Sequence, residues 1–518
     1  MSKKYALISV SDKTNIVSFA RLISKAGYDI ISTGGTAKEL QKAGIIIIPI
    51  QEITGNPESF DGRMKTISFQ IESALLYDRN NPKHLKEAKE LKIPQIDIVV
   101  CNLYPFEKTV ADKKVSYKQA IENIDVGGPT MIRAAAKNGL VVVIDPVDYE
   151  TVGDALQQEV KPELIRYLQA KAFDHLTFYD SQIAWYLRGQ LGETTFPKEL
   201  TIPGRKLVDL RYGENPHQKG AVYTRPNVTT PFNYLTKHWG RDLSLINLTD
   251  INAGLDSVRL FKEPAAVVIK HNSPSGVALG KTIAEALSNA IEADPESAFG
   301  GSIVLNKPMD LAAAKVIGSF KDAKRGNMDI VAAPHIKDNA LAFLQQVRKT
   351  IGVYSFGDIP AESDQWNLKS IDGGFVLQTA DIDIDESFKQ WQIVTKKKPT
   401  KLQLEQMQIG WKFVTKIKSN TILVIDKTIP MTRGIGSGQT SRVRSTKLAL
   451  EQAGDHTKGG ILVSDSFFPF PDSVELAAKH GIAAIVQQGG SISDKLSIEA
   501  ADKAGIPMVF TGRRAFWH

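Results

Sequence analysis

Short apolar runs alternate with amphipathic segments along the first 150 residues. The runs at 5–10, 29–32, 45–50, 96–102 and 140–144 are rich in Ile, Val and Leu and have the length of buried strands. Strands separated by helices usually form a parallel sheet with helices on its faces. The pattern therefore predicts an α/β unit at the start of the chain.

Helical spacing separates the first two of these runs. Ile16, Phe19, Ala20 and Ile23 recur at intervals that predict a helix over 12–26, closed by Gly27. Residues 150–188 have a mainly helical pattern and end the unit. The next stretch, up to residue 205, lacks periodicity and contains glycines and prolines. We therefore predict a first domain over 1–196.

The second part, 197–518, contains a further α/β pattern. Apolar runs at 460–464, 482–487 and 506–511 alternate with helical patterns at 472–480 and 494–504. Earlier in this part, the polar segment 381–400 ends in three lysines and a proline, which is typical of a linker. We expect a boundary between two subdomains of this part near 360–400.

An apolar run at 265–269 ends in the adjacent pair Lys270-His271, and a turn-forming Asn-Ser-Pro-Ser-Gly segment follows. A cation beside an imidazole at the end of a strand can perform acid–base chemistry, because α/β folds carry functional groups there. A buried strand with two polar residues at its tip has the same pattern. The pair alone leaves both interpretations open.

Composition narrows the classes of protein. The chain has 518 residues, 42% of them hydrophobic, and a net charge of +7 without a long basic block. Cys101 is the only cysteine, which excludes an internal disulfide and cysteine-based metal clusters, and the nine histidines lack HxH or HExxH spacing. We expect no metal site, no membrane span and no signal peptide, and hence a cytoplasmic protein.

Two loops of the first part have the composition of anion sites. Ser11 and Lys13 follow the first predicted strand, and Ser32, Gly35 and Thr36 lie in the loop after the second. Hydroxyls, backbone N–H groups and a helix N-terminus at a strand end can hold a phosphate. Simple N-capping with a glycine turn accounts for the same residues.

Three further segments carry candidate chemistry in the second part. Phe299 stands in a glycine turn and offers a stacking surface for a planar ring. The glycine-rich stretch 434–442 ends in Arg442 and is interpreted as an anion nest without a strand–turn–helix frame. The basic, aromatic C-terminus, which ends at His518, is expected to dock into a site.

Taken in order, eleven segments closely resemble the bifunctional purine-biosynthesis enzymes that combine AICAR transformylase and IMP cyclohydrolase. The resemblance spans essentially the whole chain. The segments are SVSDKT, DGRMKT, NLYPF, IDVGG, RAAAKN, RYGENPHQ, KHNSPSG, SAFGG, SGQTSR, SDSFFPF and FTGRRAFWH. This resemblance implies a methylglyoxal-synthase-like α/β domain with a parallel sheet, followed by two cytidine-deaminase-like α/β domains.

The resemblance also implies site residues for ring closure in the first domain. The implied phosphate-binding residues are Ser11, Lys13, Ser32, Gly35 and Thr36. The implied catalytic residues are Lys65, Tyr104, Asp125 and Lys137, with Arg63, Thr66 and Asn102 beside the substrate. We expect Asp125 and Lys137 to act as a coupled pair. Where the family continues Lys-Thr with Leu-His-Pro, this chain has Ile67-Ser68-Phe69.

For formyl transfer, the resemblance implies Lys270, His271 and Asn420 as catalytic residues. His271 would remove the amine proton of AICAR, and Lys270 would stabilise the oxyanion or protonate the leaving folate nitrogen. The implied substrate contacts are Arg211, Tyr212, Asn247, Phe299, Asp329, Arg442, Phe468, Arg514 and His518.

The resemblance further implies 10-formyltetrahydrofolate as co-substrate, AICAR and FAICAR as ligands, no catalytic metal, and a homodimer with shared transformylase sites. It leaves room for a structural monovalent cation. Two alternatives remain. In one, the altered segment after Thr66 leaves a transformylase with an inactive nucleotide-binding domain. In the other, the pI of about 9.0 reflects RNA binding, although the basic residues are dispersed and no nucleic-acid motif is present.

Overall fold

The computed structural model describes residues 3–60, 63–192, 196–320, 327–359, 366–381 and 384–518. The chain forms two compact units. The first is Met1–Arg205 with Arg225–Val228, and the second is Lys206–Thr224 with Thr229–His518. The units divide at 205/206, whereas the sequence pattern predicted 196/197; residues 193–195 and the start of the DGRMKT segment, 61–62, lie outside the described part.

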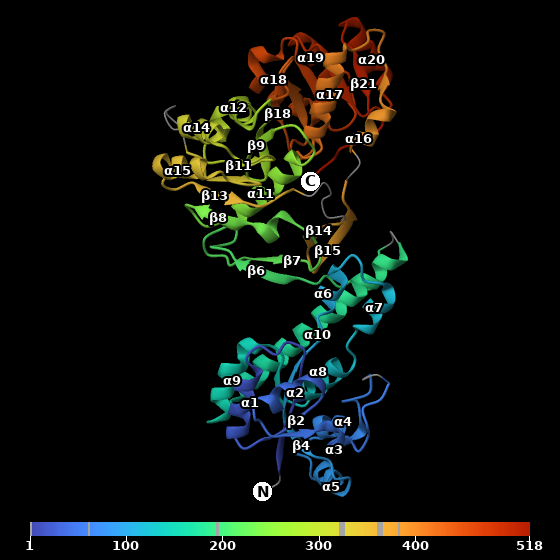
Figure 1. Ribbon diagram of the computed structural model, residues 1–518. Coiled ribbons are helices and arrows are strands. Elements are labelled where there is room, and N and C mark those ends of the chain that lie inside the picture. The colour runs from blue at the N-terminus through green and yellow to red at the C-terminus, as the bar shows by residue number, and fades with distance from the viewer. Residues whose placement is uncertain (1–2, 61–62, 193–195, 321–326, 360–365, 382–383) are drawn as a thin grey trace. The chain divides into compact units, whose positions relative to one another are not determined.

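The first unit is built on a parallel sheet of five strands (Figure 1). Its order is β3-β2-β1-β4-β5, with bounds Ile47–Pro49, Asp29–Ser32, Lys4–Val10, Gln95–Asn102 and Val141–Val143. Each strand lies within a predicted apolar run or extends one residue beyond it, because most of these side chains are buried between the two helical layers. The predicted parallel sheet is confirmed.

Helices connect and cover these strands. They are α1 (Ile16–Lys25), α2 (Gly34–Lys42), α3 (Ile50–Thr54), α4 (Phe69–Leu76), α5 (Pro82–Glu90), α6 (Phe106–Ala111), α7 (Tyr117–Glu122), α8 (Gly127–Lys137), α9 (Tyr149–Leu156) and α10 (Pro162–Leu191). Helix α1 buries Ile16, Phe19, Ala20 and Ile23, the residues that predicted it. It begins later than expected, because the Asp12 carboxylate accepts hydrogen bonds from Thr14 and forms a turn there.

The second unit contains two mixed sheets of six strands each. One has the order β10-β9-β11-β12-β13-β8, with bounds Ser273–Leu279, Ala265–Lys270, Ser302–Leu305, Ile330–Ala333, Gly352–Ser355 and Thr236–Trp239. The other has the order β18-β17-β19-β20-β21-β16, with bounds Thr432–Gly436, Ile422–Ile425, Ile461–Ser464, Ala484–Gln487, Met508–Phe510 and Gln392–Ile393. Corresponding neighbours run in the same relative directions, so the second half of this unit repeats the first.

Four α-helices of each half repeat in the same order. The first half carries α11 (Leu245–Val258), α12 (Ile283–Ala293), α13 (Pro295–Ala298), α14 (Leu311–Ser319) and α15 (Asp338–Val347). The second half carries α16 (Ile384–Ser387), α17 (Lys401–Val414), α18 (Arg442–Ala453), α19 (Asp472–Lys479) and α20 (Asp494–Lys503). Helices α11, α12, α14 and α15 match α17, α18, α19 and α20, whereas α13 and α16 have no α-helical counterpart among the described residues. Gly254 of α11 and Gly410 of α17 occupy matching positions, because an added Cβ would collide with Val304 of β11 in one half and Val463 of β19 in the other.

Two small hairpins complete this unit, β6 (Arg205–Asp209) with β7 (Ala221–Thr224) and β14 (Trp366–Ile371) with β15 (Gly374–Thr379). The hairpin β14–β15 and helix α16 fall within 360–400, where a break was expected; residues 360–365 and 382–383 of that stretch are not described. The segment 381–400 is not only a linker, because β16 pairs with β21.

The glycine-rich stretch 434–442 corrects one prediction. It lies in a strand–turn–helix arrangement of β18 and α18, which the sequence interpretation had rejected. A Cβ at Gly434 would lie 1.9 Å from the Ala449 oxygen, and one at Gly436 would lie 1.9 Å from the Ser445 oxygen. These two glycines therefore allow a strand and a helix to pack backbone to backbone.

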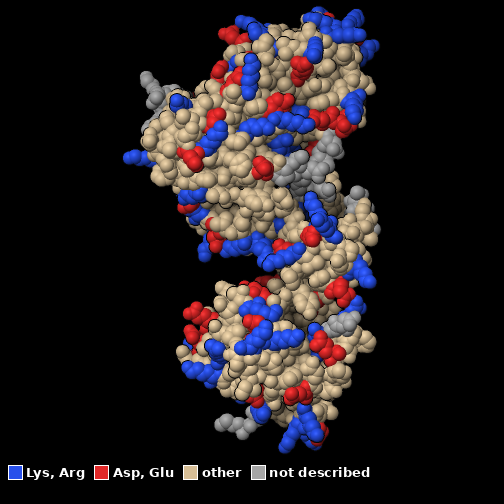
Figure 2. All heavy atoms as spheres, in the orientation of Figure 1, with Lys and Arg blue, Asp and Glu red and all other residues tan. Residues whose placement is uncertain are grey.

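The molecular surface has no concentrated charge on the face that Figure 2 presents. Lys and Arg side chains are interspersed there with Asp and Glu. In the described part of the chain, no helix combines the length and the apolar composition that crossing a bilayer requires.

Candidate active sites

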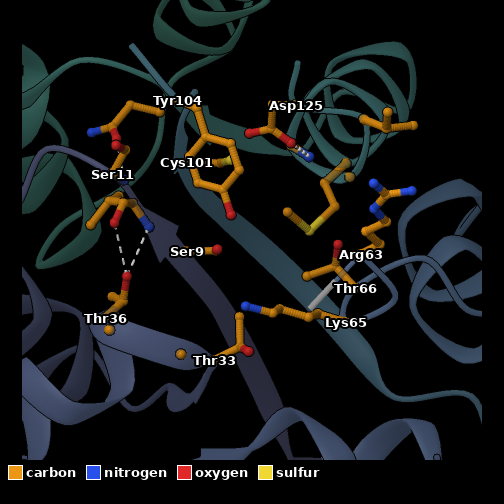
Figure 3. Close-up of a pocket in the computed structure, with 18 of the residues that line it drawn as sticks. Ser9, Ser11, Thr33, Thr36, Arg63, Lys65, Thr66, Cys101, Tyr104 and Asp125 are labelled. Carbon is orange, nitrogen blue, oxygen red and sulfur yellow. Dashed lines mark hydrogen bonds between the residues drawn. The ribbon is translucent and has the colours of Figure 1, made fainter. Parts of the chain in front are cut away.

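A pocket of about 700 Å³ opens at the carboxyl ends of β1, β2 and β4 in the first unit (Figure 3). Parallel α/β sheets bind ligands at this edge because the strands lead there into loops and helix N-termini, whose backbone N–H groups are free to bind a ligand. The predicted residues that line the pocket are Ser11, Lys13, Gly35, Thr36, Arg63, Lys65, Thr66, Asn102, Tyr104 and Asp125.

The N-terminus of α2 forms one end of this pocket. Thr33 precedes the helix, and its hydroxyl is buried without a hydrogen-bond partner among the described residues. Lys13 and Lys65 flank the helix start: their ammonium groups lie 3.8 Å from Cβ positions built at Gly35 and Gly34. Free N–H groups, a free hydroxyl and two cations suit a phosphate group.

Asn102 organises the loop on the other side of the pocket. Its side-chain oxygen accepts hydrogen bonds from the backbone N–H groups of Ser11 (2.6 Å) and Asp12 (2.8 Å), and its amide donates to the Asp12 carbonyl at 3.0 Å. Thr36 is also bound to backbone, because its hydroxyl donates to the Val10 carbonyl and accepts from the Val10 N–H. Both residues shape the pocket through backbone contacts.

Asp125 stands at the start of α8 in a tightly packed turn. Its carboxylate accepts a hydrogen bond from the Gly128 N–H at 2.9 Å. A Cβ at Gly128 would lie 2.6 Å from that carboxylate, and one at Gly127 would lie 2.7 Å from the Thr66 hydroxyl. Burial raises the pKa of Asp125, although backbone hydrogen bonds from Gly128 and Tyr104 oppose the shift. This acid therefore holds a proton more readily than an exposed aspartate.

Lys65 and Tyr104 point into the pocket in Figure 3. The Lys65 ammonium pairs with the Glu58 carboxylate at 2.7 Å, and Arg63 pairs with Glu122. The altered segment after Thr66 has a structural role here: the Ser68 hydroxyl accepts a hydrogen bond from Ile71 N–H at 3.2 Å and caps α4.

Two predicted residues do not line this pocket. Ser32 is fully buried and donates its hydroxyl hydrogen to the Ile8 carbonyl at 2.8 Å, so it joins two strands instead. Lys137 is exposed at the far end of α8, about 15 Å along the helix axis from Gly127. The expected pairing of Asp125 with Lys137 is therefore wrong in this structure, because one helix holds the two residues apart.

In the second unit, the predicted Lys270-His271 pair ends β9. The Lys270 ammonium donates to the Phe299 carbonyl at 2.9 Å, and His271 is exposed. His271 and Asn272 both have positive φ, 55° and 61°. The strand tip is therefore a tight, specific turn that presents the imidazole to solvent.

The other predicted contacts of this half have varied surroundings. The Arg211 guanidinium donates to the Tyr212 hydroxyl at 2.7 Å and lies over its ring. Asp329 pairs with Arg241 at 2.8 Å, and the Phe299 ring is half exposed. Asn247 forms a capping box with Ser244 at the start of α11, so its side-chain oxygen is engaged.

A second pocket, of about 430 Å³, lies in the other half of the unit. It gathers the predicted residues Asn420, Arg442 and Arg514. Arg442 is buried, bridges the Ser464 hydroxyl and the Asp465 carboxylate, and donates to the Asn420 side-chain oxygen at 2.8 Å. The other lining residues are Thr440, Ser441, Val443, Ser466, Phe467, Pro469, Phe470, Asp472 and Phe516.

The C-terminal tail docks at this pocket, as expected. The Ser419 N–H donates to the Trp517 carbonyl and the Ala515 N–H to the Asp465 carbonyl. His518 does not line the pocket but packs edge-to-face on Phe516. Phe468 is wrong as a lining residue: it is fully buried in the core, whereas its neighbour Phe467 lines the pocket.

Lys270 ends β9 and His271 follows it in the first half of the second unit, and neither residue lines the pocket that holds Asn420 in the other half. The sequence interpretation missed Thr33, although it lies in a loop that was singled out. It also missed Asp465, a buried acid directly after a strand.

Among the described residues, no group of three His, Cys, Asp or Glu side chains could hold a metal ion.

Comparison with known proteins gives a consistent result. Residues 135–452 match the family model described as AICARFT/IMPCHase bienzyme, and residues 15–130 match the MGS-like domain model. The chain is 45% identical to the "Bifunctional purine biosynthesis protein PurH" of Bacillus thuringiensis subsp. konkukian (strain 97-27) and 44% identical to that of Thermoanaerobacter sp. (strain X514), each over 100% of both chains. A solved structure, "Crystal structure of ForH", is 34% identical, with a TM-score of 0.33 over 37% of this chain and 99% of its own.

Proposed function

The chain belongs to the AICARFT/IMPCHase bienzyme family, and we infer that it catalyses the last two steps of IMP synthesis. AICAR receives a formyl group from a reduced folate to give FAICAR, and FAICAR then closes to IMP with loss of water. The match to bifunctional relatives over the full length of both chains carries this conclusion.

We assign ring closure to the pocket of the first unit. The anion-binding end at Thr33, Lys13 and the start of α2 suits the ribotide phosphate. The carboxamide nitrogen then attacks the formyl carbon of the same molecule, so positioning supplies much of the rate. The match to bifunctional relatives over the whole chain argues against the alternative of an inactive nucleotide-binding domain.

Three side chains support the chemistry of this step. Lys65, which points into the pocket, stabilises the oxygen that becomes negative on attack. Asp125 and Tyr104 move protons: one proton leaves the attacking nitrogen, and one must reach the hydroxyl that departs as water. Asn102 is assigned no role in proton transfer or charge stabilisation, because the oxygen and the nitrogen of its side chain are both hydrogen-bonded to the Ser11–Asp12 backbone.

Formyl transfer is assigned to the second unit. The 5-amino nitrogen of AICAR bonds to the formyl carbon of 10-formyltetrahydrofolate, and His271 takes the proton that this nitrogen loses. Lys270 lies beside this histidine and stabilises the oxyanion or supplies the proton to the leaving folate nitrogen. Asn420 and Arg442, which are hydrogen-bonded to each other, complete the site.

The separation of these residues supports a homodimer in which each transformylase site is shared. Lys270 and His271 of one protomer would meet the pocket around Asn420 of its partner. Such an isologous arrangement forms two identical sites. We also place the enzyme in the cytoplasm, where its small-molecule substrates AICAR and reduced folate would be its partners.

The test is to mix the full-length protein with AICAR and 10-formyltetrahydrofolate and to measure IMP. We expect IMP, and we expect His271→Ala to lower the rate by ~10²–10⁴ because a general base is lost. The same variant should still convert FAICAR to IMP. A wild-type protein that forms FAICAR but no IMP would point to transformylase alone, and one that forms neither would contradict the function.

A further inference from the structure

A two-residue hairpin turn joins β9 to β10 directly after Lys270. His271 and Asn272 are consecutive non-glycine residues with φ of 55° and 61°. They are the two central residues of the hairpin loop between the paired residues Lys270 and Ser273, where a type I′ turn requires a positive φ at both positions. A side chain that binds this loop from another element sets where the loop lies. The groups that hold this turn therefore determine where the imidazole and the ammonium lie.

Asp250, on helix α11, binds the backbone of this turn. One of its carboxylate oxygens accepts a hydrogen bond from the Asn272 N–H at 2.8 Å, and the other accepts from the Ser302 hydroxyl at 3.1 Å. The side chain is buried, with an exposed fraction of 4%. Burial raises its pKa, whereas these two hydrogen bonds and the charge of His271 favour the ionised form.

The repeated half provides an internal comparison. Helices α11 and α17 both begin with a capping box, at Ser244 and Thr400, and both have a glycine ten residues later. In this register Asp250 corresponds to Gln406, which is also buried but whose side-chain oxygen has no hydrogen-bond partner among the described residues.

The corresponding turn also differs. The segment 426–431, which joins β17 to β18, is described in full, and no non-glycine residue in it has a positive φ. The residue that matches Lys270 by strand register is Asp426, which pairs with Arg433 at 2.8 Å. The buried carboxylate and the left-handed pair therefore occur together in one half and are both missing from the other.

We propose that Asp250 is a positioning residue that fixes the Lys270-His271 turn for formyl transfer. It acts through the Asn272 N–H and touches no substrate itself. This inference rests on the proposed function and extends it to a residue on the helix beneath the site. The Lys270 contact to the Phe299 carbonyl fixes the ammonium independently, so loss of Asp250 should misplace the imidazole more than the lysine.

The experiment compares two substitutions in the full-length protein. Asp250→Ala removes both hydrogen bonds, and we expect kcat for formyl transfer to fall ~100-fold with KM within a few-fold, because a misplacement of about 1 Å has that effect. Asp250→Asn keeps an oxygen for the Asn272 N–H and an amide that can donate to Ser302. It should therefore remain within about five-fold of wild-type kcat.

Gln406→Ala is the matched control, since it empties the equivalent buried position in the other half and should leave kcat nearly unchanged. Wild-type kcat in Asp250→Ala, or an Asp250→Asn variant as slow as Asp250→Ala, would overturn the proposal. If Asp250→Ala does not fold, Ser302→Ala replaces it: we expect a fall of several-fold in kcat, and no fall would overturn the proposal.

Cyclisation of FAICAR, assayed on every variant, reports only on the first unit, so a thermal melt of each variant is used to report whether the second unit is folded. Failure of the proposed function would be seen in the wild-type enzyme, which would transfer no formyl group. Failure of the positioning role would leave the wild type active and would be seen only in the ratios of kcat for formyl transfer among the wild type, Asp250→Ala and Asp250→Asn.

Discussion

The two sites of this chain are built in opposite ways. In the first unit, one pocket brings together residues from the ends of β1 and β4 and from the starts of α2 and α8, and Lys65, Tyr104 and Asp125 all line it. In the second unit, the Lys270-His271 pair lies in one half, and the pocket with Asn420, Arg442 and Arg514 lies in the other.

The difference follows from the two reactions. Ring closure is intramolecular, so a pocket for one small nucleotide is enough. Formyl transfer joins two molecules, one of them a large folate, and needs a wider surface. A repeated framework offers such a surface twice, and we propose that two chains together complete it.

Among changes to the first unit, the largest effect is expected from Lys65→Ala. Loss of the cation that faces the developing oxyanion should slow FAICAR cyclisation ~10²–10³-fold. Formyl transfer should continue at the wild-type rate, so FAICAR should accumulate and can be followed by chromatography. Lys25→Ala, at the exposed end of α1, is the control. Equal loss of both activities would show that the two sites are not independent.

A complementation experiment tests the shared site. Co-expressed His271→Ala and Asn420→Ala chains should regain about a quarter of wild-type formyl transfer, since half of the dimers are mixed and each mixed dimer has one intact site. Co-expressed His271→Ala and Lys270→Ala chains should stay inactive, because both changes affect the same turn. No recovery in the first mixture would mean that each chain forms its own site.

The smallest effect concerns the stability of the first unit. Burial raises the pKa of Asp125, so the folded state binds its proton more tightly than the unfolded chain does. Stability should therefore fall as pH rises from about 4, the unfolded value, through the folded pKa. Asp125→Asn should unfold at a higher temperature than wild type at pH 7, and the gap should close below pH 4.

Thermal melts between pH 3.5 and pH 8 measure this difference, with Asp154→Asn on exposed α9 as the control. An Asp125→Asn variant that is less stable than wild type at pH 7 would mean that the ionised carboxylate stabilises the turn.

Much of the fold could be predicted, because buried strands leave a continuous apolar signal. All five strands of the first sheet, and the three strands near the C-terminus, lie within predicted runs or extend one residue beyond them. The repeat in the second unit could not be found this way, because its halves share packing constraints, such as Gly254 and Gly410, rather than similar surface residues.

The sites were predicted less completely, and the reasons are geometric. Lys137 lies in a motif of the right type, but a straight helix carries it away from Asp125. Phe467 and Phe468 are adjacent, and a chain in a turn sends neighbouring side chains in different directions. Asp250 stands within an apolar helical pattern, and its role depends on a turn that is distant in sequence.

The single cysteine has a practical consequence. Cys101 lies at the end of β4 with an exposed fraction of 2%, and burial raises the pKa of its thiol. Little reactive thiolate forms there at neutral pH. Reagents that label thiols should therefore react very little with the native chain. A cysteine introduced at an exposed position, such as Asp154, can carry a fluorophore or spin label whose signal comes from that position alone.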